Sequence, residues 1–113
     1  MAGKHTRERW RYVAFRIEGD TPFARNDFLS SLLRATRGSS FYDAFRMTVF
    51  EGDFGILKVR HRFKQDAIDA LSGLDSVLGR PCKVVTLKTS GTIKTLKEKY
   101  KDQVSRGDDR TGE

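Results

Sequence analysis

Hydrophobic and polar residues alternate along several stretches of the chain, most clearly in Gly55–Arg62. Successive side chains of a β-strand point to opposite faces of the sheet. Leu57 and Val59 would then point to one face, and a row of cations would point to the other, formed by Lys58, Arg60 and Arg62. A row of charges is costly to bury without partners. We therefore expect a central strand with one face on the core and the other toward water or an anion.

The same pattern divides the rest of the chain into strands and helices. Alternation predicts strands over Trp10–Ile17, Ala44–Glu51, Phe54–Arg62 and Cys82–Lys88. Helical spacing of apolar residues predicts one helix that starts at Thr21-Pro22 and stops at Gly38, and a second over Phe63–Gly79. A third helix is expected after Ser90-Gly91-Thr92, with a narrow apolar stripe made of Ile93, Leu96, Tyr100 and Val104.

This order of elements predicts an α+β fold of the ferredoxin-like type. The expected split βαβ arrangement is a four-stranded antiparallel sheet with two helices on one face and an extra C-terminal helix, similar to an RNA-recognition motif. The first and third strands would be central. The two helices would bury Val13, Phe15, Ile17, Leu57 and Val59. We expect a single domain over residues 10–104, between flexible tails at 1–9 and 105–113.

The opposite face of the predicted sheet is basic, with aromatic residues between the cations. Its expected members are Trp10, Tyr12, Arg16, Arg46, Phe50, Lys58, Arg60 and Arg62. On the second strand, Phe45, Met47 and Val49 are expected to point the other way, toward the core. This composition suits RNA. The strand GILKVRHR, however, has cations where an RNA-recognition motif has stacking aromatics, so contact with phosphates, with structured RNA or with protein is expected instead. In the alternative, the third helix or another subunit covers the face.

Composition and charge narrow the class of partner. The 113 residues carry a formal net charge of +7, which favours a polyanionic partner, with surface charge for solubility as the alternative. The single cysteine, Cys82, excludes an intrachain disulfide and is expected to be a small core residue in a reducing compartment. No signal peptide or membrane span is expected, so the predicted location is cytoplasmic.

A second candidate site lies at the start of the third helix, in the sequence SGTIK. Backbone N–H groups at a helix start attract phosphate, and Gly91 would let the backbone approach it closely. Ser90 and Thr92 could donate hydrogen bonds, and Lys94 and Lys97 add charge. The alternative is an ordinary capped helix start.

Three segments also resemble a known family. RYVAF in the first strand, GILKVRHR and SGTIK, in this order, are similar to ribonuclease P protein component 2, an archaeal ribonuclease P subunit family with a eukaryotic counterpart. The resemblance covers about Trp10 to Lys97. It implies a subunit of the ribonucleoprotein that removes the 5′ leader of precursor tRNA. In that family the RNA is the catalyst and holds the Mg²⁺ ions, so the chain itself would bind no cofactor.

The resemblance further implies partners, while the basic sheet face and the SGTIK helix start supply the candidate contact residues. The expected partners are ribonuclease P RNA, precursor tRNA through the holoenzyme, the component 3 subunit and other protein subunits, and no membrane. The candidate RNA-binding residues are Arg16, Arg46, Lys58, Arg60, Arg62, Ser90, Gly91, Thr92, Lys94 and Lys97.

An enzymatic site within the chain has little support from the residues. The only histidines are His5 and His61, which with one cysteine make no zinc set. Asp66, Asp69 and Asp75 are expected to be solvated. No catalytic or metal-binding residue is therefore predicted. The alternative function is a ferredoxin-like protein-interaction module of a ribonucleoprotein or other complex, without direct RNA contact.

Overall fold

An antiparallel sheet of five strands in the order β2-β3-β1-β5-β4 organises the protein. The structure is a computed structural model that describes residues 9–19, 23–39, 41–42 and 44–101. The strands are β1 (Trp10–Gly19), β2 (Phe45–Glu51), β3 (Phe54–Arg60), β4 (Ser76–Val77) and β5 (Arg80–Ser90). The helices are α2 (Arg25–Thr36), α3 (Lys64–Gly73), α4 (Ile93–Lys99) and a short 3₁₀ turn, η1 (His61–Phe63).

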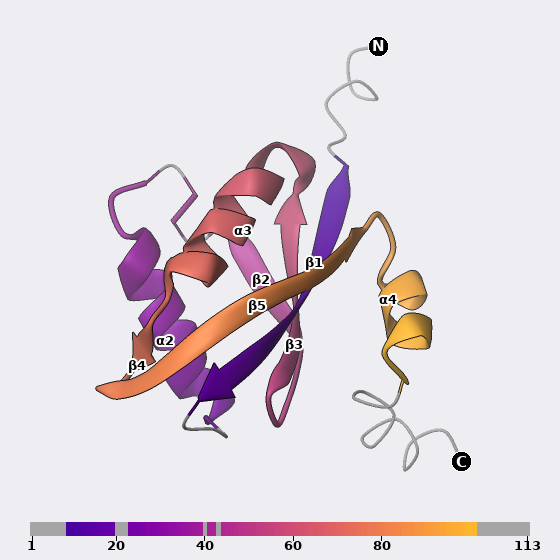
Figure 1. The fold of residues 1–113 in the computed structure, drawn as a ribbon. Helices are drawn as coiled ribbons and strands as arrows, with labels where there is room; N and C mark the ends of the chain where they lie inside the picture. The colour runs from indigo at the N-terminus through magenta and orange to yellow at the C-terminus, as the bar shows by residue number, and fades with distance from the viewer. Residues whose placement is uncertain (1–8, 20–22, 40, 43, 102–113) are drawn as a thin grey trace.

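Helices cover both faces of the sheet, with α2 and α3 on one side and α4 on the other (Figure 1). The larger core lies under α2 and α3, and the smaller one lies under α4. The larger core contains the five sheet residues predicted to be buried by the helices: Val13, Phe15, Ile17, Leu57 and Val59. The predicted direction of the β1 and β3 side chains is therefore confirmed.

The α+β antiparallel class and the central position of β1 and β3 are confirmed, but the predicted count of four strands is wrong. The expected helix Phe63–Gly79 ends at Gly73, because the backbone of Leu74 is extended (φ −77°, ψ 115°). The chain then forms β4 and turns back into β5, with Val77 opposite Arg80. The two turn residues, Leu78 and Gly79, have positive φ, as a tight two-residue hairpin requires. The ferredoxin-like description is thus only partly correct.

The first helix starts later than predicted. Thr21 and Pro22, the expected start, lie outside the described residues, and α2 begins at Arg25 after Ala24, which makes no side-chain cap. Gly38 follows the helix end with a φ of +92°, in agreement with the predicted stop. None of the helices in the described parts of the chain combines the length and hydrophobicity needed to cross a membrane.

A bulge in β2 reverses the predicted direction of two side chains. The register with β3 shifts between Met47 and Val49, so Thr48 is an extra residue without its own partner. Phe45 and Met47 face the larger core as predicted, but Val49 packs under α4 and Phe50 packs against the larger core. The Thr48 hydroxyl donates to the Ile56 carbonyl (3.0 Å) and Arg25 donates to the Met47 carbonyl, which hold the bulge in place.

Cys82 lies on β5 and packs, half-buried, against the larger core, as expected for a small apolar side chain. Burial raises the pKa of its thiol, and the charge of Asp75 raises it further. The thiol therefore stays protonated near neutral pH.

The absence of a side chain at Gly55 makes room for the main aromatic contact of the core. Phe15 lies opposite Gly55 in the sheet register, and a Cβ on Gly55 would overlap the Phe15 ring. That ring stacks on Phe28 (centroids 5.4 Å apart), which in turn contacts Phe50 (5.4 Å). β3 therefore needs glycine here to let α2 close over the sheet.

We expect Gly55→Ala to lower the free energy of unfolding by about 1–3 kcal/mol, because the new methyl group must displace the fully buried Phe15. The matched control is Gly73→Ala at the end of α3, where a Cβ meets nothing within 4 Å. It should raise stability by about 0.4–1 kcal/mol. Urea unfolding of the two variants measures both values, and equal effects would contradict the described packing of Phe15.

Candidate nucleic-acid interface

The face opposite α2 and α3 is divided into an apolar part and a basic part. Ala14, Ile56 and Leu96 are fully buried where α4 covers the sheet. The third helix therefore covers the middle of this face, as the alternative interpretation expected. Beyond α4, toward the N-terminal end of β1, cations gather around Trp10 on the same face.

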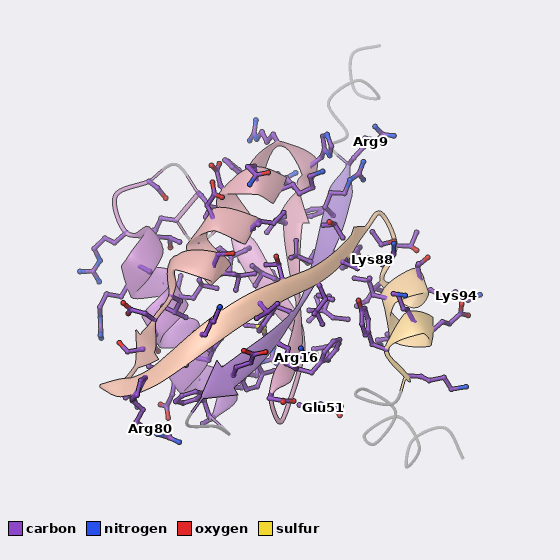
Figure 2. All side chains as sticks on the ribbon, in the orientation of Figure 1. Arg9, Arg16, Glu51, Arg80, Lys88 and Lys94 are labelled. Carbon is purple, nitrogen blue, oxygen red and sulfur yellow. The ribbon has the colours of Figure 1, made fainter. Side chains whose placement is uncertain are left out.

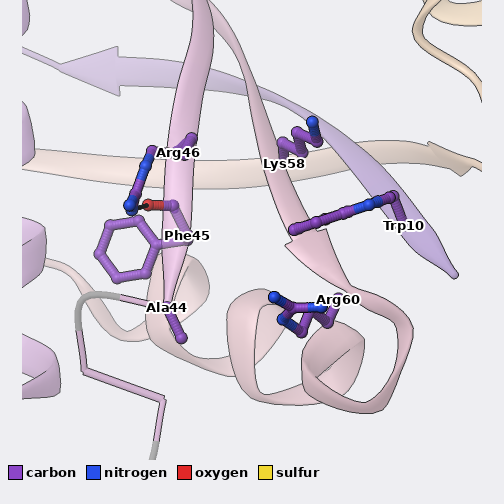
Figure 3. Close-up of a pocket in the computed structure, with 6 residues that line it drawn as sticks. All are labelled: Trp10, Ala44, Phe45, Arg46, Lys58 and Arg60. Atoms are coloured by element: carbon purple, nitrogen blue, oxygen red, sulfur yellow. Dashed lines mark hydrogen bonds between the residues drawn. The ribbon is translucent and has the colours of Figure 1, made fainter. Parts of the chain in front are cut away.

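These cations line a pocket of about 330 Å³, shown in Figure 3. We call it the Trp10 pocket, and its lining residues are Trp10, Ala44, Phe45, Arg46, Lys58 and Arg60. The described lining residues thus carry three positive charges and no negative one. The three cations come from neighbouring strands, since Arg46 on β2 is directly opposite Lys58 on β3. The sheet therefore positions the charges that alternation alone predicted to share a face.

Trp10 lies between two of these cations. The Lys58 ammonium is 4.5 Å from the centroid of the Trp10 ring, and the Arg60 guanidinium carbon is 4.7 Å from it. Figure 3 shows the ring nearly edge-on, with Lys58 on one side and Arg60 on the other. Both distances fall within the range of a cation–π interaction. The Arg46 side chain is oriented by donation from Nη1 to the Phe45 carbonyl (2.7 Å).

Two of the predicted sheet cations lie outside this pocket. Arg62 is not on a strand, because β3 ends at Arg60 and the chain turns through η1, where the Arg62 guanidinium lies over the Phe63 ring (5.0 Å). Its predicted place on the strand is wrong. Arg16 is on the expected face, but it lies toward the other end of β1 from Arg9 (Figure 2). There it is 3.6 Å from Glu18, with which it forms an ion pair.

The helix start at Ser90–Lys94 is capped by its own side chains. The backbone N–H of Thr92 donates to the Ser90 hydroxyl (3.2 Å), and that of Thr95 donates to the Thr92 hydroxyl (3.4 Å). Lys94 is exposed on α4, whereas Lys97 is half-buried. The segment therefore has the ordinary capped helix start that was the alternative to an anion site. The role of Ser90, Gly91 and Thr92 in anion binding stays a prediction.

A second group of cations surrounds His61 at the same end of the sheet. The positive charge of Arg11 lowers the pKa of His61 most, followed by desolvation and by the charges of Lys64 and Arg9. The His61 backbone N–H also donates to the Arg9 carbonyl (2.7 Å). The Arg11 side chain also lies close to Gly91: its Nη1 would be 3.3 Å from a Cβ added to that glycine. The basic region therefore extends from the Trp10 pocket around the end of the sheet toward the start of α4.

The described residues contain no group of three histidine, cysteine, aspartate or glutamate side chains that could hold a metal ion. Asp66 and Asp69 are exposed on α3, and Asp69 accepts a hydrogen bond from Gln65 (3.0 Å). These carboxylates are therefore surface groups, as predicted.

Comparison with known proteins identifies the family. The sequence profile of the Rpp14/Pop5 family matches residues 11–101, which include nearly all of the described sheet and helices. The chain belongs to this family.

Relatives of this Rpp14/Pop5 protein carry the name predicted from the three sequence segments. It is 34% identical over 110 residues to ribonuclease P protein component 2 of Natronomonas pharaonis, covering 86% of this chain and 67% of that protein. It is 33% identical over 99 residues to the protein of that name from Archaeoglobus fulgidus, covering 83% and 90%. The resemblance to this family is confirmed.

A solved structure supports the fold of this Rpp14/Pop5 protein. One chain in the cryo-EM structure of yeast ribonuclease MRP superposes with a TM-score of 0.54, covering 86% of this chain and 95% of that one. At 18% sequence identity, this similarity concerns the fold alone.

Some residues of the basic region were not among the predicted contact residues of this Rpp14/Pop5 protein. The sequence pattern puts Trp10 on the basic face without marking it as a contact residue, and it does not single out Arg9, Arg11 or Lys64. Arg9 and Arg11 alternate in step with Val13 and Phe15, so a continued alternation could have indicated a second basic group on the helix-covered side.

We expect Arg11→Leu to raise the pKa of His61, because it removes the positive charge that lowers this pKa most and so makes the imidazolium less unfavourable. The His61 ring protons can be titrated by NMR in a His5→Gln background. Arg16→Leu removes the same charge at a distant part of β1 and should leave the titration unchanged. An unaltered His61 pKa in Arg11→Leu would contradict the described position of Arg11.

Proposed function

We propose that this chain is a protein subunit of ribonuclease P and supports the catalytic RNA during removal of the 5′ leader from precursor tRNA. Support comes from its membership of the Rpp14/Pop5 family and from relatives named ribonuclease P protein component 2. The component 3 subunit and other subunits, as protein partners, and precursor tRNA, as the substrate of the assembled enzyme, belong to the same proposal on the family relationship alone.

The observation that carries the proposed RNA contact is the Trp10 pocket. Three cations from adjacent strands line one concave surface, and a second basic group lies around His61 at the same end of the sheet. Phosphate contacts of this kind release counterions and position a protein on RNA without reading bases. The strand that an RNA-recognition motif uses for base stacking has lysine and arginine here, which favours phosphate over base recognition.

Protein cations at this surface would reduce the repulsion between RNA segments that must come together in the active form. The chemistry of cleavage would belong to the RNA and its Mg²⁺ ions. In this proposal the chain contributes charge and shape, and it contributes no acid, base or metal ligand.

Reconstitution tests this function. The purified chain alone should not cleave precursor tRNA, whereas its addition to ribonuclease P RNA with the component 3 subunit should raise the cleavage rate or lower the Mg²⁺ concentration at half-maximal activity. The physical reason is that fixed protein cations replace part of the ionic screening that Mg²⁺ supplies. Metal-dependent cleavage by the chain without RNA, or no effect of the chain on the reconstituted enzyme, would contradict the proposal.

Single charge removals test the RNA contact. Lys58→Ala, Arg60→Ala and Lys94→Ala should each weaken binding to ribonuclease P RNA by about 3- to 10-fold. Each should also reduce the slope of log affinity against log salt by about 0.7–0.9. The control, Arg34→Ala, removes an exposed charge from α2 on the other side of the sheet and should change neither value.

The neutral variants Asp66→Asn and Asp69→Asn on α3 should also leave RNA binding unchanged. If Arg60→Ala disrupts pairing with the component 3 subunit while the salt slope stays the same, the sheet face is a protein interface. The ribonuclease P assignment would then stand, and the RNA site would lie elsewhere, at the Ser90–Lys94 helix start and the lysines of the third helix.

A further inference from the structure

The Trp10 ring has a cation on each of its two faces, and this arrangement restricts what the pocket can bind. Lys58 and Arg60 approach the ring centroid to 4.5 and 4.7 Å from opposite sides (Figure 3). An RNA base stacks on an aromatic side chain only if one ring face is open to it. In this structure neither face of the Trp10 ring is open, because Lys58 covers one and Arg60 covers the other. The ring is therefore not available as a stacking platform.

The register of the sheet explains how the ring reaches this position. Trp10 on β1 is directly opposite Arg60 on β3, and Lys58 lies two residues back along β3 on the same face. Side chains two residues apart on a strand are separated by about 6.6–6.8 Å, which leaves room for one flat ring between them. The ring thus separates two like charges that would otherwise repel, and it restricts two long and flexible side chains.

We propose that Trp10 is a positioning residue that holds Lys58 and Arg60 apart so that, with Arg46, they bind a phosphodiester group of an RNA strand in the Trp10 pocket. The inference rests on the proposed function, because it takes RNA as the ligand. It adds that the pocket recognises backbone phosphate and that an uncharged side chain controls its affinity.

The chemistry of the lining residues favours a phosphate. Two guanidinium groups and an ammonium group are hydrogen-bond donors only, and arginine suits the paired oxygens of a phosphate. The described lining residues contribute no carboxylate. A carboxylate of a protein partner would be the competing ligand, and the experiment below distinguishes it.

Trp10→Leu, with Trp10→Phe as the conservative control, tests the positioning role. Both substitutions leave the net charge unchanged, so simple loss of charge cannot explain a difference between them. Trp10→Leu should weaken binding to ribonuclease P RNA about 5- to 10-fold and reduce the salt slope by about 0.7, the value of one lost phosphate contact. Trp10→Phe retains a ring for the two cations and should stay within about twofold of the unsubstituted chain.

If Trp10→Leu has the same RNA affinity and the same salt slope as the unsubstituted chain, the positioning role is overturned while the proposed function stays in place. Failure of the unsubstituted chain to bind the RNA would instead remove the proposed function itself. Loss of component 3 pairing in Trp10→Leu without loss of RNA binding would assign the pocket to a protein carboxylate and would also overturn the inference.

A second measurement keeps the test valid if Trp10→Leu fails to fold. Trp10 is the only tryptophan of the chain, so its fluorescence reports on this pocket alone. Tripolyphosphate should change the emission in a saturable way, whereas uridine, a nucleoside without phosphate, should not. Lys58→Gln should reduce the response to tripolyphosphate, and Arg34→Gln on α2, on the other side of the sheet, should retain it. A response to uridine equal to that of tripolyphosphate would contradict a phosphate site.

Discussion

The burial of β1 on both of its faces is the constraint on which the rest of the structure depends. Three consecutive side chains, Val13, Ala14 and Phe15, are each at most 1% exposed. Such a strand needs a neighbour on each edge, supplied by β3 and β5, and a cover on each face, supplied by α2 with α3 and by α4. A helix as short as α4 has little stability of its own, so its packing on β1, β5 and the apolar side chains of β3 is what maintains it.

The same constraint decides where charge can gather. The sheet face under α4 is apolar where Ala14 and Ile56 are fully buried, so the cations that β1 and β3 place on this face lie toward its two ends. At one end, β1 and β3 bring Trp10, Lys58 and Arg60 together, and at the other, Arg16 pairs with Glu18. The short covering helix therefore separates the cations of this face into two groups, and the group at the Trp10 pocket carries the larger net charge.

Much of this architecture follows from local sequence patterns, and the errors arise where distant contacts decide. Alternation correctly placed the β1 and β3 side chains, because each of these strands has one consistent periodicity. It failed at Val49 and Phe50, since both are apolar and a bulge at Thr48 leaves no signal in hydrophobicity. The helical spacing of Leu71, Leu74 and Leu78 continues past the true end of α3, although Leu78 is 60% exposed in a hairpin turn. Likewise, the contact of Trp10 with two cations depends on the β1–β3 register, which pairs residues 50 positions apart.

The bulge in β2 has a consequence for how this subunit can join a larger assembly. β2 is the outermost strand on its side of the sheet, a position where another chain could add a strand through free backbone groups. The extra residue, Thr48, breaks the regular spacing of those groups, and Arg25 already occupies the Met47 carbonyl. Extension of the sheet across this edge is therefore disfavoured, and a partner that approaches β2 must be recognised through side chains rather than through main-chain pairing.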